Sequence, residues 1–555
     1  MIDRLRALRP RRHDYQGLRR GWPGELLAGV TVAVVALPLA LAFGVASGLG
    51  AEAGLVTAVV AGVVAGVFGG SHVQVSGPTG AMTVVLVPVV ASVGPGGVVV
   101  VALLAGAILV FAGVARLGRY ASVLPWPVVE GFTVGIAVLI FLQQVPPALG
   151  VETPDGTNTA VIAARALADW APAQWPALAI AALVAATMVV LPRVRRGLPA
   201  ALIAVAAATV IAEVADLSVD RIGEIPSGLP LPELPTFVAG DLPRLLSAAL
   251  AVAALGAIES LLSAKVADGM ADAEPHDPDR ELFGQGLANV SVAFFGGMPA
   301  TGAIARTAVN VRAGARTRAA AVIHGVVLAG SMVALASLLA RIPLAALAGV
   351  LMVTAVRMIE FGTVAHVVRS TRDDALLVVV TAFVTVAFDL VLAVGVGVAL
   401  ASLLALIAVA DSTSFEREPI DSVDVDPALE HALLHEHIVA YRLDGALFFG
   451  AAERFLLELA DVSDVEVVIL RLGRLRVIDS TGAQALSDLI AQLERRGITV
   501  LLTSVQPQHR ALIEHVGVIG RLAHENHLLP TLADALVHAR RHVRGPGSLK
   551  LAGNG

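Results

Sequence analysis

Apolar segments follow one another along the first three quarters of the chain, separated by short polar stretches. Seven precede a polar, Pro-rich stretch at 216–241, and seven follow it. They lie at 26–46, 53–68, 80–93, 97–115, 124–142, 176–192 and 199–216, and then at 243–264, 283–296, 302–311, 319–340, 343–358, 374–388 and 390–410. Since a membrane-spanning helix needs roughly 20 mostly apolar residues, the pattern predicts an α-helical polytopic membrane domain over 23–411. Its fourteen spans form halves of about 23–216 and 243–411.

A short phrase interrupts the apolar pattern once in each half. The two copies are Phe68-Gly69-Gly70 with Pro78-Thr79-Gly80-Ala81, and Phe295-Gly296-Gly297 with Pro299-Ala300-Thr301-Gly302-Ala303. Paired breaks at corresponding places indicate the binding site of a secondary transporter, because the free N–H groups at a half-helix start attract anions. The segments that follow are too short to span as straight helices, which favours discontinuous helices buried in protein. The phrase therefore predicts anion transport.

The composition supports a membrane protein independently. Hydrophobic residues make up 56% of the 555 residues, charged residues 15%, and the mean hydropathy is +0.80, whereas soluble chains carry about 25% charge. The absence of cysteine excludes disulfides, thiolate metal sites and cysteine nucleophiles. The net charge is −6 and no basic run is interleaved with aromatics, so we expect no nucleic-acid partner. No catalytic constellation is evident, and we expect no enzyme activity.

Charge asymmetry predicts the topology. The Arg-rich segment 1–22 precedes an apolar stretch that runs into further apolar sequence, which indicates a retained span rather than a cleaved signal. Basic residues follow the even-numbered spans, as expected of cytoplasmic loops. They are Arg116, Arg119, Arg193, Arg195, Arg196, Lys265, Arg312, Arg316, Arg318, Arg369 and Arg372. The pattern predicts an inner (plasma) membrane protein with both termini cytoplasmic and with 151–173 and 216–241 outside.

A second domain follows the last apolar segment, because charge rises after Asp411. Strand-like runs alternate with helical patterns, which indicates a small α/β domain over 415–545, with a flexible tail at 546–555. The expected strands are 437–443, 465–471 and 498–504, and the expected helices are 451–460, 481–496, 508–516 and 531–543. Between the second strand and the next helix, the polar residues from Asp479 to Thr481 suit the first free N–H groups of that helix.

Essentially the whole chain resembles the sulfate permease (SulP) family, the bacterial relatives of solute carrier family 26, whose C-terminal cytoplasmic domain is called STAS. The resemblance rests on the order of six pieces: ALPLALAF at 36–43, SGPTGA at 76–81, GAIESLL at 256–262, ARTAVN at 305–310, AGART at 313–317 and DSTG at 479–482. It implies a seven-plus-seven inverted repeat, a gate part and a core part, elevator-like movement of an anion, and a homodimer.

The resemblance also implies where the anion lies, between the starts of the third and tenth spans. On this sequence the implied contacts are Thr79, Gly80 and Ala81 opposite Ala303, Ile304 and Ala305, with Leu39 and Phe43 closing the pocket. Many eukaryotic relatives have Gln where this chain has Leu39. Arg306 has two interpretations that the sequence leaves open: it attracts the anion, or it reaches the cytoplasmic face or supports the half-helix.

Glu259 lies in the middle of an apolar run, where a carboxylate is costly unless it is protonated or bound to a cation. The resemblance associates an acid here with cation coupling. A sodium role would need further oxygen ligands, for which Ser263 and Thr301 are available, whereas the lack of a dense oxygen cluster favours the proton. The alternative is a static pair with a buried Arg or a helix terminus. We expect no cofactor beyond the co-transported H⁺, or alternatively Na⁺.

In the second domain, Ser480 occupies the position that is phosphorylated in anti-sigma-factor antagonists of this fold, which makes Asp479, Ser480 and Thr481 a candidate regulatory or protein-docking site. A helix cap is the favoured interpretation of Ser480. The histidines at His431, His435 and His437 are interpreted as a solvated linker, and we expect no metal site, because they have no supporting acid or Cys constellation.

The sequence thus predicts a secondary active transporter of small inorganic anions, with sulfate–proton symport as the leading hypothesis. A sodium-dependent bicarbonate transporter is the first alternative. Others are a dicarboxylate transporter, a nucleobase permease and a membrane-tethered signalling receptor. The added α/β domain argues against the permease, and the intact half-helix starts together with Glu259 argue against the receptor.

Overall fold

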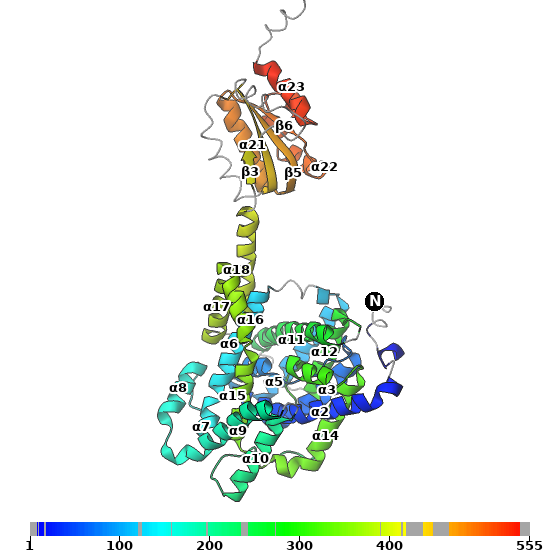
Figure 1. Ribbon diagram of the computed structural model, residues 1–555, viewed down its shortest axis with the longest axis vertical. Coiled ribbons are helices and arrows are strands. Elements are labelled where there is room, and N and C mark those ends of the chain that lie inside the picture. Colours follow the sequence, from blue (N-terminus) through cyan, green and yellow to red (C-terminus); the bar gives the residue numbers. More distant parts are fainter. Residues whose placement is uncertain are drawn as a thin grey trace, which may run out of the picture. The chain divides into compact units, whose positions relative to one another are not determined.

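The computed structural model describes residues 8, 10–15, 18–119, 125–156, 158–195, 198–234, 242–271, 274–388, 390–411, 414–417, 437–447 and 465–543. The chain divides into two compact units, Met1–Ala399 and Leu400–Gly555. Figure 1 shows helices throughout the first unit and a sheet with helices in the second. The boundary between the units lies within the last apolar segment, 390–410, and the predicted domain bounds at 411 and 415 stay predictions.

Helices make up nearly all of the first unit. They are α2 (Leu18–Ala46), α3 (Ala51–Phe68), α4 (Gly80–Val93), α5 (Pro95–Val114), α6 (Trp126–Gln143), α7 (Val145–Leu149), α8 (Thr159–Asp169), α9 (Trp175–Val194), α10 (Ala200–Val214), α11 (Leu242–Met270), α12 (Pro278–Phe294), α13 (Ile304–Arg312), α14 (Ala319–Leu339), α15 (Leu344–Met358), α16 (Phe361–Ser370) and α17 (Arg372–Ala387). The helix α18 (Leu390–Asp411) crosses the boundary between the units.

Each of the fourteen apolar segments coincides with one of these helices. Among the described residues, eight helical stretches are long and apolar enough to cross a membrane, and three apolar helices are shorter, including Gly80–Val93 and Ala200–Val214. The count of fourteen spans therefore stays a prediction. The stretch 151–173, predicted as a loop, contains the helix α8, whose N-terminus is capped by Asn158 through hydrogen bonds from the N–H groups of Ala160 and Val161.

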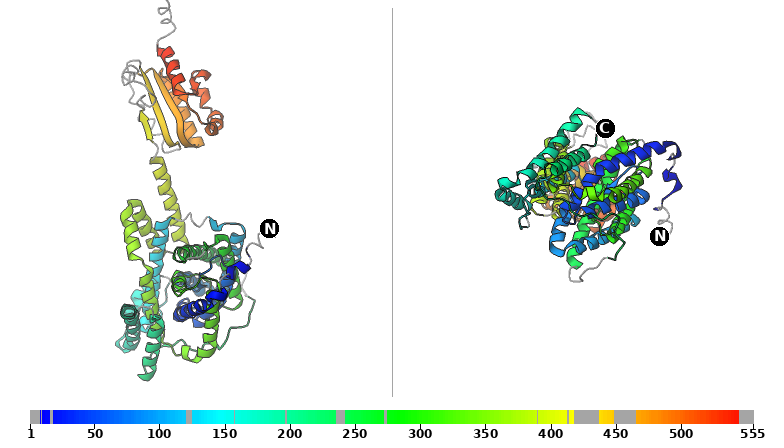
Figure 2. Two further views of the ribbon diagram at one scale, coloured as in Figure 1. Left: turned by 45° about the vertical axis from the view of Figure 1, so that its right-hand side comes forward. Right: turned by 90° about the horizontal axis from the view of Figure 1, so that it is seen from below.

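Small residues let helices from the two halves approach closely. The helix α12 packs against α3 and α5, and α14 packs against α2 and α3. Figure 2 shows these helices gathered together in the first unit, beside α6, α9 and α15. At the α5–α12 contact, a Cβ on Gly106 would lie 2.7 Å from the carbonyl oxygen of Gly286, and the converse distance is also 2.7 Å. Such close backbone contact is typical of membrane helix packing.

The two helix breaks meet in a short ladder. Strands β1 (Ser76–Gly77) and β2 (Thr301–Gly302) pair antiparallel, with Ser76 opposite Gly302 and Gly77 opposite Thr301. The ladder pairs backbone groups of segments that no longer form helical hydrogen bonds, which the interior of a membrane domain requires. It also brings the starts of α4 and α13 together, although they are far apart in the sequence.

The second unit has a five-stranded sheet in the order β3-β4-β5-β6-β7. Its elements are β3 (Ser414–Arg417), β4 (Ile438–Leu447), β5 (Val467–Ile478), α21 (Ser480–Arg495), β6 (Thr499–Thr503), α22 (Pro507–His515), β7 (Leu528–Leu529) and α23 (Leu532–Val543). Strands β4 to β7 are parallel and β3 is antiparallel to β4. The helices α21 and α23 contribute to the apolar clusters on opposite faces of the sheet.

The three predicted strands and the helices at 481–496, 508–516 and 531–543 are present in this unit. The short strands β3 and β7 were not predicted, because two to four residues carry too little periodicity. The predicted helix 451–460, His431, His435 and the tail 546–555 lie outside the described residues.

Candidate functional site

Two half-helices start at the β1–β2 ladder. Thr79 is the N-cap of α4, and its hydroxyl accepts a hydrogen bond from the N–H of Met82 at 3.5 Å. Ala303 is the N-cap of α13 and has no side-chain group that could cap the helix. At the start of α13, Ile304 and Ala305 are exposed. This helix start therefore offers N–H groups that its own cap does not satisfy, as an anion site requires.

A close contact shapes the start of α4. A Cβ on Gly80 would lie 3.2 Å from Cε1 of Phe43 and would collide with the side chain of Ile140. Phe43 is buried, and Leu39, one helical turn before it, is half-buried. The structure thus brings Phe43 against the first half-helix, in agreement with its expected position, while its contact with an anion remains untested.

Glu259 joins the two breaks. This carboxylate, on α11, accepts a hydrogen bond at Oε2 from the hydroxyl of Thr301 at 2.7 Å and from the hydroxyl of Thr79 at 3.1 Å. Its neighbour Ser260 accepts a hydrogen bond from the N–H of Gly302 at 3.0 Å. One carboxylate oxygen therefore contacts one residue from each copy of the repeated phrase.

Ser263 makes a different contact. Its hydroxyl is fully buried and lies 3.3 Å from the hydroxyl of Thr307 on α13, which in turn accepts a hydrogen bond from the N–H of Val75. Of the two oxygen ligands expected around Glu259, the structure therefore brings Thr301 to the carboxylate and places Ser263 in a contact that ties α13 to the first break.

Arg306 connects the second half-helix to the first break. Its side chain is buried, and Nη2 donates to the carbonyl oxygen of Pro78 at 2.6 Å. Its Nη1 has no hydrogen-bond partner among the described residues, and a Cβ on Gly77 would lie 2.5 Å from this atom. Of the interpretations left open for Arg306, extension to the cytoplasmic face does not fit its burial, because the guanidinium donates to the carbonyl oxygen of Pro78 inside the protein. The structure agrees with support of the half-helix and leaves attraction of the anion untested.

A polar face of α12 holds both breaks and was missed in the sequence. Glu281 is buried and accepts hydrogen bonds from the N–H groups of Gly70 and Ser71 and from the side-chain amides of Gln74 and Gln285. About two turns after Glu281, the Asn289 side chain accepts a hydrogen bond from the N–H of Ala300 and donates one to its carbonyl oxygen. The three polar residues of α12, Glu281, Gln285 and Asn289, are spaced by four, and this spacing was the signal available in the sequence.

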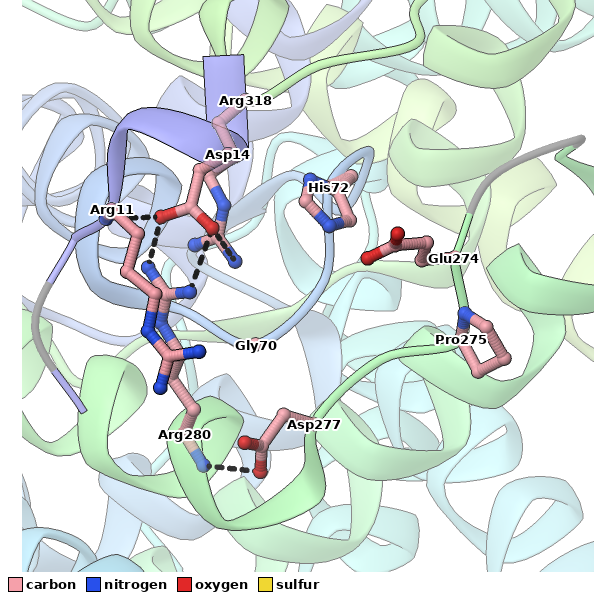
Figure 3. Close-up of a pocket in the computed structure, with 9 residues that line it drawn as sticks. All are labelled: Arg11, Asp14, Gly70, His72, Glu274, Pro275, Asp277, Arg280 and Arg318. Carbon is pink, nitrogen blue, oxygen red and sulfur yellow. Dashed lines mark hydrogen bonds and ion pairs between the residues drawn. The ribbon is translucent and has the colours of Figure 1, made fainter. Parts of the chain in front are cut away.

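A polar pocket of about 150 Å³ lies beside the loop that precedes β1. Figure 3 shows the guanidiniums of Arg280 and Arg318 converging on Asp14. Arg280 donates two hydrogen bonds to this carboxylate, at 2.6 and 2.9 Å, and Arg318 donates to the carbonyl oxygen of Gly69. Burial opposes ionisation of Asp14, but the hydrogen bonds from Arg280 and from the Arg11 N–H, with the charge of Arg318, hold the pKa of Asp14 below its usual range.

Arg318 was predicted as a loop residue, yet its side chain is 1% exposed. The segment before α2 is therefore attached to the loop of the first break through a buried network of charges. This pairing has no local signal in the sequence, because Asp14 and Arg318 are widely separated along the chain.

In the second unit, the polar turn after β5 starts the helix α21 as expected. The helix cap is Asp479, whose carboxylate accepts a hydrogen bond from the N–H of Gly482 at 2.7 Å. The favoured interpretation of Ser480 as the cap is wrong, because Asp479 has the extended backbone of an N-cap while Ser480 is already the first helical residue. Ser480 and Thr481 are exposed, and a regulatory role for the three residues remains a prediction.

Comparison with known proteins identifies both parts. Residues 23–381 match the sulfate permease family and residues 432–535 match the STAS domain. The chain is 34% identical to the putative sulfate transporter YvdB of Bacillus subtilis, covering 90% of this chain and 95% of the relative. It is 33% identical to the bicarbonate transporter BicA of Synechocystis, covering 94% of each chain. The structure of SLC26A9 shares the fold, with a TM-score of 0.77 at 19% identity over 94% of this chain and 91% of that one.

Proposed function

The chain belongs to the sulfate permease family of anion transporters, and we propose that it carries sulfate across the membrane in symport with a proton. The observation that carries the proposal is the contact of Glu259 with Thr79 and Thr301, one residue from each helix break. An ionisable group placed between two half-helix starts is positioned to sense whether an anion is bound there.

The hydroxyl partners of Glu259 suit a change of protonation. A threonine hydroxyl can donate a hydrogen bond to an ionised carboxylate or accept one from a protonated carboxyl. Glu259 can therefore take up a proton without leaving either hydroxyl unsatisfied, which would otherwise cost about 1–3 kcal/mol. Protonation also removes a negative charge beside the helix starts, so proton binding and anion binding favour each other through Coulomb attraction and repulsion.

The surroundings of Glu259 favour a proton over a sodium ion. A sodium site needs several oxygen ligands, and Ser263, the nearest serine on the same face of α11, lies against Thr307 instead. Among the described residues, the hydrogen-bond partners of the carboxylate are two hydroxyls, which a proton on Glu259 can satisfy without further ligands.

The proposal extends to the mechanism and the setting. The helix breaks are fixed by α11, α12 and the β1–β2 ladder, which supports movement of the site as a rigid core in an elevator-type exchange. From the charge pattern, we also propose that the chain lies in the inner membrane with cytoplasmic termini. From the family, we propose a homodimer and a cytoplasmic protein partner for the STAS domain.

Bicarbonate is the second candidate substrate. The similarity to a bicarbonate transporter over 94% of the chain favours it. Leu39 favours it as well, because a side chain without a hydrogen-bond donor contributes little to binding a divalent oxyanion at this position. In that case coupling to sodium replaces coupling to the proton.

The test is uptake of radiolabelled sulfate and, at alkaline pH, bicarbonate into proteoliposomes that contain the full chain. Inward proton and sodium gradients are imposed separately on the native protein, on Glu259→Gln and on the control Glu130→Gln, whose carboxylate bonds Trp126 away from the breaks. We expect proton-driven sulfate uptake that is lost only in Glu259→Gln. Sodium-driven bicarbonate uptake would replace the proposal by the second candidate, and proton-driven uptake that survives in Glu259→Gln would refute the coupling role.

A further inference from the structure

Three histidines of the second unit point their ring nitrogens at one another. His538 and His542 lie one turn apart on α23, and His527 ends the short 3₁₀ helix Glu525–His527 just before β7. One ring nitrogen from each of the three lies within 4.8 Å of the others, and Nε2 of His538 is 3.3 Å from Nε2 of His542.

These distances match a tetrahedral metal site. With metal–nitrogen bonds of about 2.05 Å, two ligand nitrogens of tetrahedral zinc lie about 3.3 Å apart and the centroids of their rings about 5.2 Å apart. The centroid distances are 5.1 Å for His527–His542, 5.1 Å for His538–His542 and 5.4 Å for His527–His538. The ring centroids therefore lie at about the separations that a single ion would impose, and the nitrogens of His538 and His542 have the matching distance.

The ring of His527 is buried and has a nitrogen that makes no hydrogen bond among the described residues. Its side chain is 3% exposed, and Nδ1 is buried with no hydrogen-bond partner among the described residues. An imidazole nitrogen that is buried and has no hydrogen-bond partner is suited to bind a metal ion, because the metal takes the place of the missing partner.

We propose that His527, His538 and His542 bind one divalent transition-metal ion, with Zn²⁺ as the best match. Three imidazoles select zinc, copper, nickel or cobalt over magnesium and calcium, which prefer oxygen ligands. The fourth position is open to water or to His524, whose ring centroid lies 6.2 Å from that of His527. The proposal is independent of the transport mechanism.

The site would fasten α23 to the sheet. The helix already packs on β5, β6 and β7 and buries Ala535 and Ala539 against them. A metal ion held by two residues of α23 and by His527 would add a cross-link between this helix and the segment leading into β7. Binding should therefore stabilise the second unit, since an ion that binds only the folded state raises its stability.

The experiment uses the full chain in detergent, prepared without a polyhistidine tag and stripped of metal. Co²⁺ is added while the visible absorption is recorded, and Zn²⁺ binding is measured by calorimetry. The variants are His538→Gln and His542→Gln, singly and together. The matched control is His515→Gln, an exposed histidine of α22. A second readout is the shift in melting temperature on addition of Zn²⁺.

We expect one ion per chain, absorption bands typical of tetrahedral Co²⁺, and a rise in melting temperature. Each single variant should weaken binding by about tenfold or more, while His515→Gln should bind like the native chain. Equal binding by the double variant and the native chain would overturn the proposal, as would octahedral Co²⁺ bands or an equal response to Mg²⁺. Because His542 is exposed, its variant tests the site without disturbing the fold.

Discussion

Two interior carboxylates, Glu259 on α11 and Glu281 on α12, both contact the helix breaks but have different hydrogen-bond partners. Glu281 accepts four hydrogen bonds of 2.7–3.1 Å, all from N–H groups. Glu259 accepts two, both from hydroxyls. An N–H group can only donate, whereas a hydroxyl can also accept. Protonation of Glu281 would therefore leave donors unsatisfied, while protonation of Glu259 would not.

Both carboxylates lie inside the protein, so burial does not distinguish them. The hydrogen-bond partners do, because N–H groups suit a carboxylate that keeps its charge, whereas hydroxyls also suit one that changes its charge. Glu281 holds the loop at Gly70 and Ser71 in place by accepting hydrogen bonds from their N–H groups. Glu259 has partners that accommodate both of its forms. We expect the two residues to differ in what their substitution affects: stability for Glu281 and transport for Glu259.

The largest effect is expected for Glu281→Gln. The new amide would direct an N–H group at donors that now meet a carboxylate, so we expect a loss of about 3–5 kcal/mol in the free energy of unfolding. The measurement is thermal denaturation and size-exclusion chromatography of the detergent-solubilised chain. Glu259→Gln is the matched control and should remain folded with a melting temperature close to that of the native chain. If the two variants were equally stable, the distinction drawn from their partners would be wrong.

A smaller effect, confined to transport, is expected for the hydroxyls. Thr301→Val removes the shorter of the two bonds to Glu259, 2.7 Å against 3.1 Å for Thr79. One hydrogen bond to a charged group contributes about 1.5 kcal/mol, so proton-driven uptake should fall by roughly tenfold, and by less in Thr79→Val. Thr301→Ser should retain uptake.

The control for this series is Thr354→Val, whose hydroxyl donates to the carbonyl oxygen of Val350 within α15. Uptake that falls equally in Thr301→Ser and Thr301→Val would mean that the methyl group, and not the hydroxyl, is what the site requires.

The smallest effect is expected for Asp14→Asn. Asp14 is a third interior carboxylate, to be compared with Glu259 and Glu281. Its partners are charged guanidiniums, and we expect the segment 10–15 to open locally while the helices stay folded. We therefore expect a loss on the order of 1 kcal/mol in global stability, with faster hydrogen exchange at 10–15. Asp155→Asn, at an exposed position, is the control. A loss as large as that of Glu281→Gln would show that this segment is part of the core.

The helical segments, the two breaks and Glu259 could be predicted from the sequence, because each has a local signal. Apolar runs of sufficient length specify membrane helices, Gly and Pro interrupt them, and an acid within such a run is conspicuous. The assignment of Ser480 as a cap failed by one residue, since the backbone conformation of Asp479 decides which residue precedes the helix.

From the sequence, we examined the histidines of the linker, His431, His435 and His437, as possible metal ligands. The group that includes His538 and His542 on α23 was overlooked. His538 and His542 are spaced by four in a predicted helix, which is a local signal, but His527 joins them only through the packing of α23 beside β7. Glu281 was overlooked for a similar reason, because its partners at Gly70, Ser71 and Gln74 lie in the other half of the membrane domain.

The helices and the family could be identified from local patterns, since apolar periodicity and short motifs act within a few residues of one another. The tertiary structure decided the partners of each polar group: Thr79 and Thr301 at Glu259, Pro78 at Arg306, and Asp14 at Arg280. Hydrogen bonds between distant segments depend on how helices pack, and in an interior without water most buried donors and acceptors are paired within the protein.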